Sequence, residues 1–498
     1  MSLEDDLLRQ RHQRLTQIRE LGFEPYGHKF DFTHTVPQIL SEYGGKSAEE
    51  LVPQVHARVA GRVQTIRRMG KAGFLHLLQQ GQKLQLYIKK GGLPDNSYDL
   101  FQLLDIGDII GASGYLFRTK TGELSLHVEE LFFLSKIMLP LPEKWHGLED
   151  VETRYRQRYL DLIANPEVQN VFVTRSKIVR ALRRVLESHG FLEVETPMMQ
   201  PLYGGAAARP FRTHHNTLDL DLYLRIAPEL YLKRLLVGGL ERVYEINRNF
   251  RNEGISTQHN PEFTMLEFYQ AYTDYRGMMD LSRELLREAA IAATGSTSVT
   301  YDGQTIDFAD FASYSMREAV TVFWQGTGKP TLQDVSDPAW LKTQSRESSP
   351  GAALADIFER HVEEKLIQPT FIYDYPVEIS PLSKNKPGDP AFVERFEIFA
   401  AGMELGNAFT ELNDPQEQRR RFEMQLARKA SGDDEAHAMD EDYVRALAYG
   451  MPPAGGEGIG IDRLTMILTG SKSIRDVILF PLLRPEGEIG LVERLRDL

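Results

Sequence analysis

The segment RVYEINRNFRNEGISTQHNPEFTMLEFYQAY, residues 242–272, alternates charged or polar side chains with apolar ones. Its two ends have the period of two that strands show, and its middle is rich in turn-forming residues, so the segment predicts a long antiparallel hairpin. The alternation places Glu245 and Arg251 on one face of the first strand and Glu267 on one face of the return strand. Charged groups are costly to bury without partners, so the pattern indicates either a solvated face or a site for an ionic ligand. The many polar groups beside aromatic ones favour a site for an ionic ligand over a solvated face.

A second segment supplies two carboxylates. Residues 397–414, EIFAAGMELGNAFTELND, contain Glu404 and Glu411. Seven residues along one flat strand would place these two side chains on opposite faces. The Gly406–Asn407 pair indicates a turn between two strands, which would bring the carboxylates together. From the spacing alone, two solvated surface carboxylates are the more frequent outcome.

These groups need strands and helices to hold them, and the C-terminal part of the chain supplies both. Residues 456–468, GEGIGIDRLTMIL, predict a glycine-rich strand that leads into a helix beginning near Arg463. The stretch SKIVRALRRVLESHG predicts an amphipathic helix that ends at Gly190. Helices and strands then mix to the end, which is typical of an α+β domain; we place it at residues 166–498, with a small Gly-, Pro- and Ser-rich insertion near 325–352.

The N-terminal part predicts a separate module over residues 1–145. Residues 4–21 have helical spacing of leucines, and residues 54–136 predict five short strands split by glycine turns. Five strands in a module of this size suit an OB-type β-barrel, although an SH3-like or another small barrel stays open on pattern alone. Pro140, Pro142 and the charges after them indicate a linker, which we place at residues 146–165.

Composition excludes several classes of protein. The 498 residues contain no cysteine, so disulfides, thiolate metal sites and cysteine nucleophiles are excluded. No apolar run approaches the roughly 18 residues that a membrane span needs, and the N-terminus is charged without an apolar signal core, so we expect a cytoplasmic protein without a membrane segment. The net charge of −13 argues against a uniformly basic coat for nucleic acid but leaves local basic patches open.

The chemistry-bearing segments resemble the signature motifs of class II aminoacyl-tRNA synthetases. FLEVETPMM (191–199) resembles the first motif, which builds a dimer interface; NFRNEG with HNPEFTMLEFY resembles the second, and GEGIGIDR the third. The three occur in order, and the class I signatures HIGH and KMSKS are absent. The resemblance implies a catalytic domain built on an antiparallel sheet flanked by helices, an anticodon-binding OB-fold before it, and a homodimer.

The resemblance also implies an ATP site with two catalytic arginines. Arg251 would bridge the amino-acid carboxylate and the α-phosphate, a role that suits a guanidinium because its fork can pair with two planar anions. Arg463 would grip the γ-phosphate, Glu253 would accept from the adenine amino group, and Phe263 would stack on the adenine. The implied ATP-binding residues are Arg251, Glu253, His259, Asn260, Phe263, Glu404 and Arg463, with Mg²⁺ held by Glu404 and Glu411.

Two further stretches, residues 153–162 and 203–239, resemble lysyl-tRNA synthetases of the bacterial type, and this similarity covers nearly the whole chain. Lysine needs an acidic, hydrogen-bonding pocket for its ammonium group, and a pocket built for a buried polar group rejects analogues that lack it. By resemblance, Glu229 and the Gly205 region would receive the α-amino group. The implied lysine-binding residues are Gly205, Glu229, Arg251, Glu267 and Tyr269.

The N-terminal module would then read the anticodon of tRNA for lysine. Phe74 would stack on an anticodon base, Gln85 would read its edge, Glu130 would accept from it, and Arg67 would contact the RNA, since loop bases are the usual readable target in RNA. Base stacking on an aromatic residue contributes about 1–3 kcal/mol. The alternative is that Phe74 belongs to the barrel core.

Three other functions stay open. An aspartyl- or asparaginyl-tRNA synthetase shares the fold, a paralogue could bind tRNA without charging it, and a relative could ligate lysine to a protein. Two positions depart from the family pattern: Met403 precedes Glu404 where a basic or polar residue is more familiar, and Glu457 stands where an apolar residue is usual.

Overall fold

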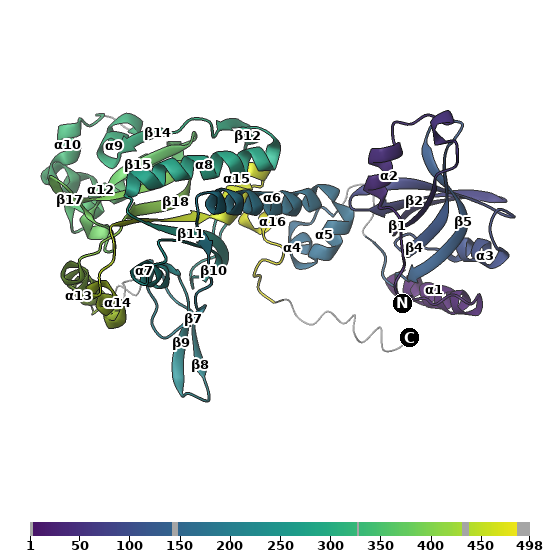
Figure 1. Ribbon diagram of the computed structural model, residues 1–498, viewed down its shortest axis with the longest axis horizontal. Coiled ribbons are helices and arrows are strands. Elements are labelled where there is room, and N and C mark those ends of the chain that lie inside the picture. Colours follow the sequence, from purple (N-terminus) through teal and green to yellow (C-terminus); the bar gives the residue numbers. More distant parts are fainter. Residues whose placement is uncertain (1–2, 142–147, 326–327, 431–437, 486–498) are drawn as a thin grey trace. The chain divides into compact units, whose positions relative to one another are not determined.

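The structure, a computed structural model, describes residues 3–141, 148–325, 328–430 and 438–485. It divides into two units, formed mainly by residues 1–169 and 170–483 (Figure 1). The predicted linker begins among residues 142–147, which lie outside the described residues; after them, α4 (Val151–Arg156) and α5 (Arg158–Ala164) are helical.

Unit 1 contains a closed barrel with the strand order β1-β2-β3-β5-β4, which confirms the predicted OB-type barrel. Alternation along β2 explains its core: Leu75 and Leu77 are fully buried, whereas Phe74 and His76 between them are half-buried on the outer surface. The predicted N-terminal helix is confirmed as α1 (Leu3–Glu20). The other elements are α2 (Val36–Tyr43), β1 (His56–Met69), β2 (Ala72–Gln79), β3 (Gln82–Lys89), α3 (Asp95–Leu103), β4 (Ile109–Arg118) and β5 (Leu124–Ser135).

Unit 2 is built on a sheet with the order β14-β15-β17-β18-β19-β11-β10-β6, and β16 pairs with β17. Its central strands are antiparallel, and the predicted hairpin is confirmed as β10 and β11, in which Glu245 lies opposite Glu267. The strands are β6 (Leu192–Glu193), β10 (Arg242–Phe250), β11 (Glu262–Ala271), β14 (Ala312–Ser315), β15 (Thr370–Pro376), β16 (Asn385–Lys386), β17 (Asp389–Ala400), β18 (Met403–Thr410) and β19 (Ala454–Gly460).

The helices α6 (Pro166–Ser188), α8 (Tyr275–Thr294) and α15 (Ile461–Thr469) cover one face of this sheet, and α7 (Glu229–Val237) packs on part of the other face, where Val243 and Tyr269 lie. Figure 1 shows α8 running along the sheet beside α15. Residues from these helices and from α6 share one apolar core with Leu266, Phe268 and Ile459 of the sheet. Alternate residues, such as Glu267, therefore point away from this core.

The remaining elements of unit 2 lie around the sheet. The predicted insertion contains helices rather than loop alone, and its residues 326–327 lie outside the described residues. These elements are β7 (Met199–Gln200), β8 (Arg212–His215), β9 (Leu220–Leu224), α7 (Glu229–Val237), β12 (Ser298–Tyr301), β13 (Gln304–Asp307), α9 (Met316–Phe323), α10 (Leu332–Ser336), α11 (Pro338–Gln344), α12 (Pro350–His361), α13 (Pro415–Ala430), α14 (Glu441–Ala448) and α16 (Ile474–Val477). In the part of the chain that the structure describes, every helix is too short or too polar to cross a membrane.

Glu457 of β19 is a charged residue inside the apolar core. It pairs across the sheet with Phe268 and Ala408, and its side chain accepts a hydrogen bond of 2.5 Å from Ser282 of α8. The other carboxyl oxygen has no hydrogen-bond partner among the described residues. Burial raises the pKa of Glu457 to about 8, so the folded protein holds a proton that the unfolded chain releases.

We expect Glu457→Leu to stabilise the protein, and more so as the pH rises. Because the pKa is raised in the folded state, the stability contributed by this group is full below about pH 4.5 and is lost as the pH rises toward 8. The gain at pH 7 should be at most about 3 kcal/mol, or a Tm rise of roughly 5 °C, and should be small at pH 5. Thermal unfolding at the two pH values measures it, with Ser282→Ala, which removes the donor, as a destabilising control. An equal gain at both pH values would contradict the prediction.

Candidate active site

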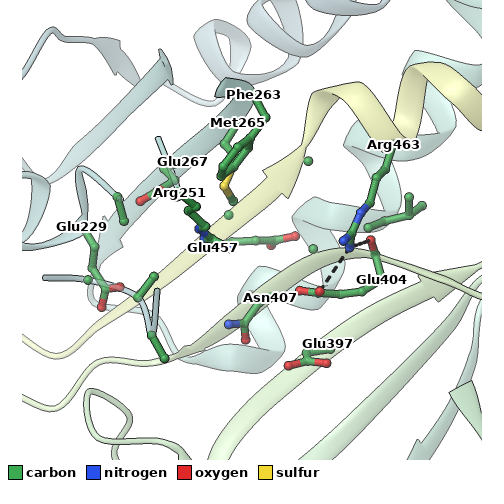
Figure 2. A pocket seen from close by; sticks show the side chains of 18 of the residues that line it. Glu229, Arg251, Phe263, Met265, Glu267, Glu397, Glu404, Asn407, Glu457 and Arg463 are labelled. Carbon is green, nitrogen blue, oxygen red and sulfur yellow. Dashed lines mark hydrogen bonds and ion pairs between the residues drawn. The ribbon is translucent and has the colours of Figure 1, made fainter. Parts of the chain in front are cut away.

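A cavity of about 540 Å³ opens on the face of the sheet opposite α8 and α15. Figure 2 shows its floor, where side chains from β11, β18 and β19 converge with residues of the loop between β10 and β11. The structure brings together in this cavity all but one of the residues predicted to bind ATP, lysine or metal: Gly205, Glu229, Arg251, Glu253, His259, Asn260, Phe263, Glu267, Tyr269, Glu404 and Arg463. Glu411 is the exception.

Arg251 and Phe263 lie together in the cavity, with Arg251 between Glu267 and Arg463 (Figure 2). The Arg251 guanidinium lies 5.0 Å from the centroid of the Phe263 ring. Burial lowers the pKa of Arg251, although nearby carboxylates, Glu404 first, oppose this effect. Its Nε has no hydrogen-bond partner among the described residues. A half-buried cation with a free donor is prepared to bind an anion.

Arg463 lies at the start of α15, as the sequence predicted, and lines the phosphate end of the cavity. It donates from Nη1 to the backbone oxygen of Glu404 at 2.8 Å and to the Glu404 carboxylate at 3.3 Å, as the dashed lines in Figure 2 show. Its Nη2 lies 3.1 Å from Nε2 of His259. Burial and then Arg463 lower the pKa of His259, so its ring is neutral and can accept this hydrogen bond.

The predicted turn at Gly406–Asn407 is wrong, because β18 runs unbroken from Met403 to Thr410. The register with β17 shifts at one place, where Ile398 pairs with Gly406 but Phe399 with Glu404. Seven residues of strand separate Glu404 from Glu411 by roughly 20 Å, so the two carboxylates lie at opposite ends of the strand. Glu411 forms its ion pair with Lys233 instead. The expectation that Glu404 and Glu411 share one metal ion is therefore corrected.

Glu397 of β17 is the carboxylate that lies near Glu404, and the sequence did not single it out. Both residues line the cavity. Glu397 pairs with Arg395 at 2.6 Å and accepts from the Tyr375 hydroxyl at 2.8 Å. Burial, together with the nearby Glu404, raises the pKa of Glu397 to about 7. Two carboxylates that disfavour each other's charge make a suitable place for a divalent cation.

The other end of the cavity is acidic. Tyr269 donates to Glu267 at 3.1 Å, and both side chains are buried. Burial, and then the nearby Glu229, raises the pKa of Glu267 to about 8. Gly205 has a φ of +89°, and a Cβ there would lie 2.9 Å from Cβ of Glu229, so this position needs glycine to leave room for Glu229. The end is thus prepared for a ligand with positive charge.

Lys233 of α7 and Glu411 also belong to this end, and the sequence did not predict the lysine. The fully buried Lys233 ammonium forms ion pairs with both Glu229 and Glu411. Burial acts to lower the pKa of Lys233, but the two carboxylates outweigh it and raise the pKa above its ordinary value. Gly456 of β19 makes room here, since a Cβ would lie 2.2 Å from a Glu411 oxygen and 2.4 Å from the Tyr269 ring.

A second hollow, of about 370 Å³, lies on the outer surface of the barrel in unit 1. Arg67, Phe74 and Gln85 line it, as predicted for the anticodon site, so Phe74 is not a residue of the barrel core. Glu130 does not line it and is exposed elsewhere on β5, opposite Ser113. The carboxylate in the hollow is Glu123, which accepts from Gln85 at 2.7 Å.

Comparison with known proteins agrees with this geometry. Residues 150–484 match the family described as tRNA synthetases class II (D, K and N), and residues 57–134 match the OB-fold nucleic acid binding domain. The chain is 55% identical over 489 residues to the lysine–tRNA ligase of Pelotomaculum thermopropionicum, covering 97% of this chain and 95% of the relative. It is 55% identical to that of Moorella thermoacetica (98% and 100% covered) and 51% identical to one of Staphylococcus aureus (96% and 99% covered).

Proposed function

Because the chain belongs to the class II tRNA synthetases and, within them, to the lysine–tRNA ligases, we propose that the cavity of unit 2 joins lysine to ATP and that the hollow of unit 1 receives the anticodon. The observation that carries this assignment is the polarity of the cavity. Arginines lie at one end, suited to phosphates, and buried carboxylates lie at the other, suited to ammonium groups.

In the first step, a carboxylate oxygen of lysine attacks the α-phosphorus of ATP. The bond between the α-phosphorus and the bridging oxygen breaks, giving lysyl-adenylate and pyrophosphate. Arg251 lies between the two ends and can pair with the lysine carboxylate and the α-phosphate together. Arg463 pairs with the γ-phosphate, while Phe263, Glu253, His259 and Asn260 hold the nucleotide. Catalysis rests on positioning and charge stabilisation without a protein nucleophile.

A magnesium ion fits the nucleotide end. We assign it to Glu404 with Glu397, because Mg²⁺ takes one or two carboxylates and completes its shell with phosphate oxygens and water. When bound, the ion would offset phosphate charge. The described residues contain no group of three or more His, Cys, Asp or Glu side chains that could hold a metal, which matches a site that needs substrate oxygens.

Lysine selectivity comes from the acidic end. We propose that Glu229 and the Gly205 region receive the α-ammonium and that Glu267 and Tyr269 receive the ε-ammonium. An amino acid without the second ammonium leaves Glu267 buried without its partner, which is strongly disfavoured. An aspartate side chain would meet buried carboxylates at this end, where the Lys233 ammonium is already paired with Glu229 and Glu411, which argues against an aspartate-charging enzyme.

In the second step, a terminal ribose hydroxyl of tRNA attacks the lysyl carbonyl and releases AMP. The hollow of unit 1 would hold the anticodon, with Phe74 stacking on a base, Gln85 and Glu123 reading base edges, and Arg67 contacting phosphate. Such charging takes place in the cytoplasm, where we expect this protein to act.

A homodimer is proposed from the first motif. Leu192, Met198 and Met199 are about half exposed in the described part of unit 2. Apolar side chains grouped on a surface often mark a protein interface. Sedimentation analysis measures the assembly.

We expect Phe74→Ala to slow tRNA charging while leaving lysine-dependent ATP–pyrophosphate exchange intact. Loss of one stacked base costs about 1–3 kcal/mol, or roughly 5- to 150-fold in kcat/KM for tRNA. The matched control is Phe132→Ala, which removes another half-buried aromatic of the barrel that does not line the hollow. Equal loss of charging and exchange in Phe74→Ala would mean that Phe74 supports the fold instead.

The decisive test of the assignment is ATP–pyrophosphate exchange with each of the twenty amino acids. Lysine should support exchange far better than any other. Exchange with aspartate or asparagine would move the chain to another member of the family, and exchange with none would favour a tRNA-binding paralogue. Charging of a tRNA transcript for lysine then separates this function from ligation of lysine to a protein.

A further inference from the structure

Lys233 is a charged side chain of the acidic end to which the proposed reaction gives no role. It belongs to α7 and lies one turn after Glu229. Its side chain has no exposed surface, and its ammonium forms ion pairs with Glu229 and Glu411. It also lies 5.0 Å from the centroid of the Phe409 ring, which lines the cavity. A fully buried lysine is rare unless its charge is matched, and here two carboxylates match it.

At the acidic end, buried carboxylates outnumber buried cations. Glu229, Glu267 and Glu411 contribute three buried carboxylates, and Lys233 contributes one ammonium. Nearby charges are already paired: Glu245 with Arg225 at 2.7 Å and Glu397 with Arg395 at 2.6 Å. Among the described residues, two carboxyl groups therefore remain without a cationic partner of their own at this end.

Free lysine carries two ammonium groups and one carboxylate, and Arg251 would take the carboxylate. The number of ammonium groups on lysine thus equals the number of carboxylates to which Lys233 gives no matching charge. Buried charges are tolerated when they are paired, so this balance favours a substrate with two ammonium groups over one with a single ammonium group.

We propose that Lys233 is a positioning residue that sets amino-acid selectivity by neutralising one of three carboxylates and holding Glu229 and Glu411 in place. This inference rests on the proposed function. Without the Lys233 ammonium, the carboxylates cannot all stay ionised and fixed at these positions. The pocket then loses its arrangement for two ammonium groups, although Lys233 itself touches no reacting atom.

The test is ATP–pyrophosphate exchange with the full-length Lys233→Met protein. Removing one partner of a buried ion pair is costly, so KM for lysine should rise about a hundredfold. KM for ATP should stay within about twofold, because Lys233 does not face the nucleotide end. Norleucine, which keeps the α-ammonium but lacks the ε-ammonium, serves as a competitive inhibitor; its inhibition constant should rise less than KM for lysine, so that the preference for lysine falls.

Two further variants test whether the change in lysine affinity arises from the charge of Lys233. Lys233→Met with Glu411→Gln restores the count of two uncompensated carboxylates, so it should fold and recover about tenfold or more of the lost lysine affinity. Arg234→Met is the matched control, because it removes the neighbouring cation of α7, which pairs with Asp440 at 2.7 Å and does not line the cavity. It should leave KM for lysine unchanged.

Three outcomes would overturn the proposal: a parallel rise in KM for ATP and lysine, an unchanged preference for lysine over norleucine, or a double variant no better than Lys233→Met. Absence of lysine-dependent exchange in the unaltered protein would instead reject the proposed function. The two failures are therefore distinguishable.

Discussion

Arg251→Ala is expected to abolish lysine-dependent ATP–pyrophosphate exchange, with a loss of about 10³-fold or more in kcat/KM, because one guanidinium pairs with both reacting groups. Among the described residues, the Nε of this half-buried side chain has no hydrogen-bond partner, and the guanidinium lies 5.0 Å from the Phe263 ring, between the phosphate end and the acidic end. Its removal takes away the charge that brings two anions together.

Arg251→Lys is the informative companion. A lysine keeps the charge but lacks the planar fork, so most of the loss should remain. Thermal unfolding should be little changed in both variants, since Arg251 makes few contacts that a stable fold needs. Exchange retained in Arg251→Ala would reject the assignment of this cavity as the active site.

Glu267→Gln is expected to weaken lysine binding by about a hundredfold or more above pH 8, because the buried carboxylate is the proposed partner of the ε-ammonium. Since burial and Glu229 raise the pKa of Glu267 to about 8, lysine must displace a proton from it below that pH. In the unaltered protein, lysine affinity should therefore rise with pH, up to about tenfold per unit, and level off above pH 8.

The pH profile separates this role from a general loss of structure. Glutamine cannot ionise, so the slope of log lysine affinity against pH should be smaller by about one in the variant. Titration calorimetry in buffers of different ionisation enthalpy measures the proton released on binding. An unchanged slope, or an equal rise in KM for ATP, would show that Glu267 does not receive the ε-ammonium.

Much of the fold could be predicted from the sequence because the patterns are local. Alternation across residues 242–272 predicted the β10–β11 hairpin, and five glycine-separated strands predicted the barrel. The same alternation placed Glu267 and Tyr269 on one face of the return strand, and both line the cavity.

The parts of the site that the sequence did not predict depend on tertiary geometry. A single register shift between β17 and β18 brings Glu397 near Glu404, and no local pattern signals such a shift. Lys233 occupies a helical stretch in which a lysine is ordinarily solvated, and only packing of α7 buries it. Glu123 precedes β5, so spacing alone could not choose it over Glu130.

The unbroken course of β18 has a consequence for the spacing of the two substrates. Glu404 at its start lies at the phosphate end, and Glu411 directly after it pairs with Lys233 at the acidic end. The backbone of β18, which rises about 3.3 Å per residue, thus fixes the distance between the two binding ends. Side-chain substitutions can weaken or relax either end but cannot move the two ends apart. The nucleotide and the amino acid are therefore held at a separation that a side-chain substitution at either end leaves unchanged.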